Sequence, residues 1–164
     1  GGVSALCLLP RYENLLIVRT FSKSRSMAGM RIGYAIGNEK LIAYLEDAKF
    51  SFNSYTMNLP SLRAGVASVE DDAYFREKVE AVIATREWTK EKLRGLGFTF
   101  PDSKSNFIFA SHERVPAKEL FLALREKEIY VRYFEKPRID NYLRISIGTQ
   151  EQMNTLIAFL EQYL

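Results

Sequence analysis

Residues 20–33 read TFSKSRSMAGMRIG, and this stretch indicates both the fold and the chemistry of the chain. It places a lysine, several hydroxyl groups, arginines and two glycines between two apolar runs, Leu15–Val18 and Ile32–Ile36. Each run is short and apolar, which predicts a buried β-strand. In α/β proteins, the loop that leaves such a strand is where ligands bind. We therefore expect a ligand-binding loop that offers an amine for covalent chemistry beside groups that suit a phosphate.

Lys23 is the candidate for covalent chemistry in this loop. An aldehyde forms an imine only with a neutral amine, and nearby cations or a dry pocket disfavour the ammonium form. Arg25 and Arg31 are near enough in sequence to act in this way. Arg31 is better suited to a phosphate, because its planar guanidinium can bind two oxygens at once. Thr20 and Ser22 can donate hydroxyl hydrogen bonds to the same group. The alternative is a solvated basic surface loop, which the complete ordered pattern disfavours.

This segment resembles the lysine segment of the pyridoxal-phosphate (PLP) aminotransferases, whose pattern is Ser/Thr-x-Ser-Lys followed by Gly-x-Arg-x-Gly. The matching residues are Thr20, Ser22, Lys23, Gly29, Arg31 and Gly33. Within that superfamily the chain is most similar to the histidinol-phosphate aminotransferase branch, through the runs Tyr12–Lys23 and Leu143–Thr149. The resemblance extends over nearly the whole chain. It implies that Lys23 is the catalytic residue that holds PLP, and that Thr20, Ser22 and Arg31 bind the cofactor with it.

The same resemblance implies the fold. We expect an α/β chain with the trailing part of a PLP-transferase large domain in residues 1–57. A connector helix in residues 58–95 and a small C-terminal α+β domain in residues 96–164 are expected to follow. In the family, an Asp that pairs with the pyridine nitrogen and a Tyr that contacts the ring hydroxyl lie upstream of such a segment. We therefore expect the chain to correspond to the C-terminal portion of a longer enzyme and to be inactive alone.

Composition limits the classes of protein that need to be considered. The chain has 164 residues, of which 47% are hydrophobic, and this favours one globular domain or parts of two over disorder. The net charge is only +3, with basic and acidic residues interleaved, so no broad nucleic-acid-binding face is expected. No signal peptide or membrane-spanning segment is evident in the sequence, and we expect a cytoplasmic protein without a membrane partner.

Gly29, Gly33 and Gly37 recur every four residues, a spacing that also occurs where membrane helices pack. A spanning helix needs about 20 apolar residues, and Arg31 interrupts a short run here. Close backbone packing around a strand is therefore the better interpretation.

Cys7 and His112 are each the only residue of their type. Cys7 lies in the apolar run Ala5–Leu9 and is interpreted as a buried, inert thiol. His112 lies among polar residues and is expected to be exposed. Without a second histidine, neither a zinc site nor a Ser-His-Asp triad is expected, so no metal is predicted.

The rest of the chain alternates helices and strands. Asn38 and Asn58 are predicted helix caps, and the second helix, with Pro60 in its first turn, continues to Gly95 with a break or a kink at Glu70–Asp72. Residues 50–57 are loop-like. The further elements expected are strands at 98–100, 107–110, 129–134 and 143–147, and helices at 116–127 and after a capping box at Thr149 and Gln152, with Met153, Leu156, Ile157 and Leu160 inward.

Arg132 and Arg144 lie within predicted strands, where an unpaired charge is costly unless a partner is present. The resemblance assigns Arg144 to the α-carboxylate of an amino-acid-like substrate or 2-oxo acid, and Arg132 to the phosphate of a phosphorylated substrate. It also implies that Asn106 faces the active-site cleft. The alternatives are a structural ion pair for each arginine and ordinary turn chemistry for Asn106.

The resemblance implies that the complete enzyme is a homodimer. It would transfer an amino group between histidinol phosphate, or a similar amino-acid-like or amino-phosphate substrate, and 2-oxoglutarate. Lys23 would then move a proton from the substrate Cα as base and acid, while the cofactor supplies the electron sink. Two alternatives stay open. One is a PLP-dependent decarboxylase or lyase of the threonine-phosphate decarboxylase type, whose lysine segment looks much the same. The other is a catalytically inactive isolated domain.

Overall fold

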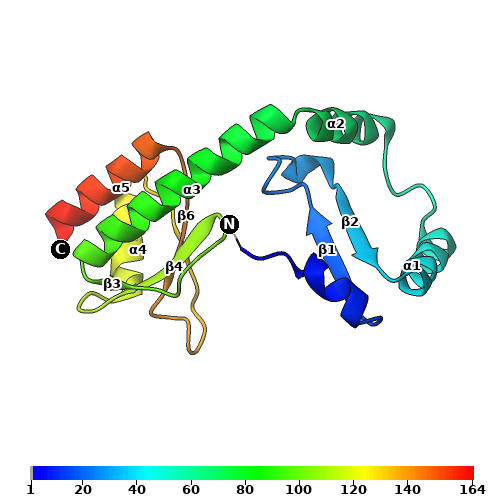
Figure 1. Ribbon diagram of the computed structural model, residues 1–164. Helices are drawn as coiled ribbons and strands as arrows, with labels where there is room; N and C mark the ends of the chain where they lie inside the picture. The colour runs from blue at the N-terminus through cyan, green and yellow to red at the C-terminus, as the bar shows by residue number, and fades with distance from the viewer. Residues whose placement is uncertain (1) are drawn as a thin grey trace. The chain divides into compact units, whose positions relative to one another are not determined.

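Figure 1 shows the computed structural model of the chain, which describes residues 2–164. Helices and strands are mixed along the chain, and the predicted α/β fold class is confirmed. The chain divides into two compact units, residues 2–77 and 78–164. The division lies inside helix α3 (Asp72–Gly95), within the segment expected to be the connector. The expected domain boundaries after residues 57 and 95 stay predictions.

The first unit is built on an antiparallel pair of strands, in which Leu16 lies opposite Gly37. A Cβ atom on Gly33 would lie 3.1 Å from the carbonyl oxygen of Arg19, and one on Gly37 would lie 2.9 Å from the Leu16 side chain. The predicted close packing around a strand is therefore confirmed for these two glycines, whereas Gly29 faces open space. The elements of this unit are η1 (Ala5–Arg11), β1 (Leu16–Thr20), η2 (Ala28–Met30), β2 (Gly33–Gly37), α1 (Glu39–Phe52) and α2 (Leu59–Glu70).

Two predictions of burial in this unit are wrong. Strands β1 and β2 are not buried, since Val18 is 66% exposed and Tyr34 is 47% exposed. Among the described residues the sheet has only these two strands, which leaves much of their surface uncovered. Cys7 is also exposed, because its run forms the 3-10 helix η1 rather than a core strand. Its thiol donates to the carbonyl of Ser4 at 3.3 Å.

The helix starts of the first unit follow the predicted capping. The Asn38 side chain accepts a hydrogen bond from the backbone N–H of Lys40, and Asn58 accepts one from Ser61. Pro60 lies in the first turn of α2, as expected. The prediction of a loop beginning at residue 50 is wrong, since α1 continues to Phe52. No helix-breaking residue precedes Asn53, so the helix continues to that point.

The predicted break between α2 and α3 is confirmed at the acidic cluster. The backbone N–H of Asp71 still bonds to the carbonyl of Ala67, while the Asp71 carboxylate accepts from the N–H of Tyr74. At the other end, α3 stops at Gly95, but the left-handed residue is Gly97, with φ +85°. Gly97 therefore makes the turn after α3, instead of the Gly95 cap that the sequence predicted.

The second unit packs helices against a four-stranded antiparallel sheet of order β3-β4-β6-β5. Its fully buried core joins Leu93 of α3, Ile108 of β4, Leu124 of α4 and Leu143 of β6. The predicted inward face of the last helix and its capping box are confirmed. The further elements are β3 (Phe98–Thr99), β4 (Phe107–His112), α4 (Ala117–Glu126), β5 (Arg132–Tyr133), β6 (Leu143–Ser146) and α5 (Gln150–Tyr163).

His112 is buried, so its predicted exposure is wrong. The side chain is 4% exposed. Its Nδ1 accepts from the backbone N–H groups of Arg114 and Val115 at 3.3 and 3.0 Å. Nε2 lies 2.9 Å from the carbonyl oxygen of Leu96. An Nδ1 that accepts two bonds leaves the proton on Nε2, so the ring donates to Leu96 and satisfies three backbone groups.

Candidate active site

The lysine loop connects β1 to β2 and is closed by its own backbone. The carbonyl of Lys23 accepts from the N–H of Ser26 at 3.0 Å, and Ser26 adopts φ +55° to make this tight turn. The N–H of Met27 then bonds to the carbonyl of Phe21 at 3.1 Å. The N–H of Phe21 bonds to the carbonyl of Ile32 at 3.0 Å, which brings the two ends of the loop together. The Lys23 side chain is exposed on this turn.

Three of the predicted cofactor residues surround the point where the loop leaves the strands. Thr20 is the last residue of β1 and lies opposite Gly33. Arg31 precedes Gly33 by two residues, so Thr20 and Arg31 lie at the same end of the hairpin. Ser22 is half-buried and Thr20 is exposed. The hairpin therefore brings hydroxyl groups and a guanidinium to the end of the strands at which Lys23 lies. This donor set suits a ligand that has both an aldehyde and a phosphate.

Arg31 has an unusual backbone. It ends η2 in the left-handed conformation, with φ +57°. Residues other than glycine rarely adopt this conformation, and when they do it is often at functional sites. One guanidinium nitrogen donates to the carbonyl of Ala28 at 2.9 Å, which holds the side chain back against the loop. The chain then turns directly into β2.

Helix α2 supports the loop from one side, as the hairpin end beside α2 in Figure 1 shows. The hydroxyl of buried Ser61 donates to the carbonyl of Met30 at 3.0 Å. A Cβ atom on Gly65 would lie 3.1 Å from the side chain of Ile32 and 3.9 Å from that of Phe21. Ser61 and Gly65 lie one turn apart on α2, so small residues on one helical face let the helix approach the loop closely.

Arg25 is directed at the end of α2. One of its guanidinium nitrogens donates to both the backbone carbonyl and the hydroxyl of Ser68. The guanidinium carbon lies 4.2 Å from the ring centre of Phe75 and 5.5 Å from that of Phe21. Arg25, considered from the sequence as a cation beside Lys23, is therefore engaged with two helices.

Arg132 and Arg144 lie directly opposite each other on the neighbouring strands β5 and β6. Both side chains are exposed, on the sheet face away from the core. The ring of Phe134 lies 5.5 Å from the guanidinium carbon of Arg132 and 5.9 Å from that of Arg144, and Phe107 lies 5.7 Å from Arg144. Within residues 2–164, neither arginine forms an ion pair with a Glu or Asp. The structural ion pair considered as an alternative is thus not seen.

Asn106 precedes β4 and is exposed. Its carbonyl accepts from the N–H of Ile147 at 2.9 Å, which extends the pairing of β4 with β6 by one step. The next residue, Phe107, lies opposite Ser146 and contributes the ring beside Arg144. Asn106 and Arg144 thus belong to the same pair of strands.

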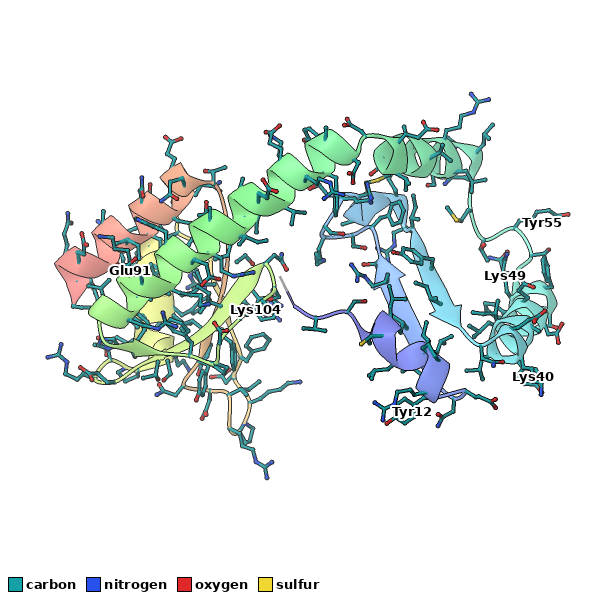
Figure 2. All side chains as sticks on the ribbon, viewed as in Figure 1. Tyr12, Lys40, Lys49, Tyr55, Glu91 and Lys104 are labelled. Carbon is teal, nitrogen blue, oxygen red and sulfur yellow. The ribbon has the colours of Figure 1, made fainter. Side chains whose placement is uncertain are left out.

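A cluster of charged residues on α3 and in the segment before β4 was not predicted from the sequence. We call Arg86, Glu87, Lys90 and Asp102 the α3 charge network. Lys90 is 2% exposed and binds Glu87 at 2.8 Å as well as Asp102. Arg86 is 3% exposed, binds Glu87 at 2.8 Å, and donates to the carbonyl of Ser105 at 3.1 Å. Lys104, labelled in Figure 2, binds Asp102 at 3.0 Å from solvent.

The α3 charge network fixes the segment that leads into β4. Asp102 and Ser105 both lie in that segment, and they bind Lys90 and Arg86 respectively. The hydrogen bond from Lys90, followed by that from Lys104, holds the pKa of Asp102 at about 2. Asp102 and then Glu87 raise the pKa of Lys90 in turn. Residues 86, 87 and 90 look like an ordinary solvated helix face in sequence, and only the fold brings Asp102 to them.

The family model described as Aminotransferase class I and II matches residues 1–160. The chain belongs to the class I and II aminotransferases. The histidinol-phosphate aminotransferase of Brachyspira hyodysenteriae is 54% identical over 154 residues, which cover 94% of this chain and 44% of that protein. The chain therefore spans less than half the length of this curated relative.

Solved structures agree with the aminotransferase fold. A decarboxylase from Sulfurospirillum multivorans superimposes with a TM-score of 0.83 at 27% identity, over 99% of this chain and 47% of that one. The histidinol-phosphate aminotransferase from Sinorhizobium meliloti, solved in complex with pyridoxal-5′-phosphate, gives a TM-score of 0.76 at 20% identity, over 93% of this chain and 42% of that one.

In this aminotransferase chain, the residues predicted for the site form two groups. Thr20, Ser22, Lys23 and Arg31 lie together at the end of the β1–β2 hairpin in the first unit. Arg132, Arg144 and Asn106 lie on neighbouring strands of the second unit. The roles assigned to them from the sequence stay predictions. No cluster of His, Cys, Asp or Glu suited to a metal occurs among residues 2–164, and no helix there is long and apolar enough to span a membrane.

Proposed function

We propose that the complete protein is a PLP-dependent aminotransferase. It would transfer the amino group of histidinol phosphate, or of a similar amino-acid-like substrate, to a 2-oxo acid such as 2-oxoglutarate. The observation that supports this most directly is the hairpin end with Lys23, Thr20 and Arg31, in a chain 54% identical to a histidinol-phosphate aminotransferase. The complete protein is expected in the cytoplasm, where amino-acid biosynthesis takes place.

In this proposal the residues of the lysine loop hold the cofactor. Lys23 would hold the cofactor covalently by condensing with its aldehyde, with loss of water, and Arg31 would bind the phosphate with two of its N–H groups. Thr20 and Ser22 donate hydroxyl hydrogen bonds to the same phosphate. When bound, the cofactor supplies an electron sink for the charge that develops at the substrate Cα.

Lys23 also carries the proton transfer. With the substrate bound, the Lys23 amine would act as the base that takes the proton from the substrate Cα, and as the acid that returns it. Its exposed position on a backbone-closed turn supports this role, because the loop holds the residue while leaving the amine accessible.

Arg132 and Arg144 provide the anion-binding part of the proposal. Like charges directly opposite on neighbouring strands repel each other, so an anion held between or beside them is favoured. We assign Arg144 to the α-carboxylate and Arg132 to the substrate phosphate. The aromatic rings of Phe107 and Phe134 stack against the guanidinium groups and limit their orientations. Asn106 lines the same side of the cleft in this proposal.

Replacing Lys23 tests the proposal. Lys23→Ala in the complete protein is expected to abolish amino transfer from histidinol phosphate and the visible absorbance of the PLP imine, because no other amine would take its place. The matched control is Lys40→Ala, which removes an exposed lysine at the start of α1 (Figure 2) and should retain both. A Lys23→Ala protein that keeps the imine absorbance would exclude Lys23 as the cofactor lysine.

A second candidate, decarboxylation of a phosphorylated amino acid, is favoured by the similarity to the Sulfurospirillum multivorans decarboxylase. Which bond at Cα breaks depends on how the substrate is held relative to the cofactor ring. Incubation of the complete protein with phosphorylated amino acids separates the two reactions. Release of CO₂ without formation of glutamate from 2-oxoglutarate would favour decarboxylation over our first choice.

The residues 1–164 alone are expected to bind PLP weakly or not at all and to be inactive, as a catalytically silent domain would be. Titration of this chain with PLP, followed by absorbance, measures the affinity and the number of PLP molecules bound per chain. Tight binding with one PLP per chain would show that the lysine loop is sufficient.

A further inference from the structure

Arg25 lies two residues after Lys23, and its guanidinium is held outside the lysine turn. It donates to the carbonyl and hydroxyl groups of Ser68, in the last turn of α2. It also stacks on Phe75, in the first turn of α3, at 4.2 Å, and on Phe21 within its own loop at 5.5 Å. One side chain thus joins the lysine loop to the end of one helix and the start of the next.

Each of these contacts is favourable for a physical reason. The last carbonyl groups of a helix have no partner within the helix, and the C-terminus carries a partial negative charge. A cation at Ser68 therefore satisfies a free acceptor and stabilises the end of α2. Arginine suits the site better than lysine, because its flat guanidinium can stack on Phe75 while donating in its own plane.

We propose that Arg25 is a positioning residue for Lys23. The backbone between them forms the tight turn in which the Lys23 carbonyl accepts from Ser26. Anchoring Arg25 at α2 and α3 limits the movement of this turn, and the direction of the Lys23 amine is set with it. The consequence for the cofactor rests on the proposed function, whereas the consequence for the order of the loop does not.

The experiment compares Arg25→Met, Arg25→Lys and the control Arg114→Met in the complete protein. Arg114 is an exposed arginine with a surface partner, Glu113, in the second unit. Hydrogen exchange measured by mass spectrometry reports the order of residues 21–32. Reduction with borohydride at increasing PLP concentration traps the adduct, and mass spectrometry locates it on Lys23. Circular dichroism shows whether each variant folds.

Arg25→Met is expected to speed amide exchange in residues 21–32 and to raise the half-saturating PLP concentration about tenfold, as loss of a charged hydrogen bond would. Arg25→Lys should show smaller changes in amide exchange and in half-saturating PLP concentration than Arg25→Met. Arg114→Met should match wild type in both. If Arg25→Met does not fold, Phe75→Leu, which removes the stacking partner, is expected to show the same two changes to a smaller degree.

The outcomes separate the two proposals. Unchanged exchange in residues 21–32 of a folded Arg25→Met protein would overturn the positioning role. Faster exchange with unchanged trapping of PLP on Lys23 would also overturn it, since the loop would then move without affecting the amine. Failure of the wild-type protein to trap PLP on Lys23 would instead contradict the proposed function, while the exchange measurement would still decide whether Arg25 orders the loop.

Discussion

Arg31 combines a strained backbone with a side chain suited to a phosphate. It lies two residues before β2 and has a left-handed φ of +57°. Its hydrogen bond to the carbonyl of Ala28 holds the guanidinium against the loop. A strained residue persists where the surrounding structure holds it. Here the backbone pairing of Phe21 with Ile32 does so, and we infer that the orientation of the guanidinium is part of the cofactor site.

Arg31→Lys is predicted to weaken PLP binding by the complete protein about tenfold or more, because an ammonium cannot bind two phosphate oxygens in the plane of a fork. Equilibrium titration followed by absorbance measures the change. The matched control is Arg138→Lys, since Arg138 is also exposed with a positive φ, +72°, but lies in the second unit, between β5 and β6. Equal affinity of wild type and Arg31→Lys would contradict the phosphate role.

His112 is predicted to be a structural residue. His112→Ala would leave the carbonyl of Leu96 and the N–H groups of Arg114 and Val115 without their buried partner. The expected loss is about 2–4 kcal/mol in the free energy of unfolding, which urea denaturation measures. An unchanged unfolding midpoint would show that water replaces the ring at no cost.

At the scale of elements, the α3 charge network makes the link between α3 and β4 depend on pH. The pKa of Asp102 is lowered from 3.8 to about 2 by Lys90 and then Lys104. A carboxyl group whose pKa is lower in the folded state stabilises the protein above its ordinary pKa. That contribution is lost as the pH falls through the folded value. Stability supplied by Asp102 should therefore disappear between about pH 4 and pH 2.

The measurement compares wild type with Asp102→Asn by urea denaturation across this pH range. The difference in unfolding free energy is expected to be largest above pH 4 and to vanish toward pH 2. A Lys90→Met background should remove most of the difference at every pH, because Lys90 is the principal partner of Asp102. A constant difference from pH 6 to pH 2 would show that the ion pair does not act in solution.

At the scale of the whole molecule, α2 has an apolar stripe that nothing in residues 2–164 covers. Its members recur at helical spacing and are 47–59% exposed: Leu59, Leu62, Val66 and Val69. Such a stripe is typical of a surface that is buried by a partner. The chain spans less than half the length of its curated relative, so we expect the stripe to be buried in the complete protein.

Val66→Asp is therefore predicted to lower the unfolding free energy of the complete protein, since it places a charge in a buried apolar contact. Urea denaturation measures the loss. Leu122→Asp is the control, because Leu122 is a partly exposed leucine of α4 in the other unit. An unchanged unfolding free energy of the Val66→Asp protein would show that the stripe faces solvent in the complete protein.

Local features of this fold were predictable from the sequence. Asn38, Asn58 and Thr149 cap helices as expected, because a cap acts on backbone groups two or three residues away. Burial was less predictable. Cys7 is exposed and His112 buried, since burial depends on which distant residues cover a side chain. Among the site residues, the loop that carries Lys23 follows a local pattern, whereas the roles of its side chains stay predictions.

Helix N-terminal caps and membership of the aminotransferase family follow from patterns within short stretches of residues. The hairpin that joins Thr20 to Arg31 belongs to this class, because the two strands are separated by only one loop. Other features required the folded chain. Asp102 reaches Lys90, Arg25 reaches Phe75, and Arg132 faces Arg144 only after folding. The physical reason is that these contacts depend on how separate elements pack together, which no local periodicity or motif contains.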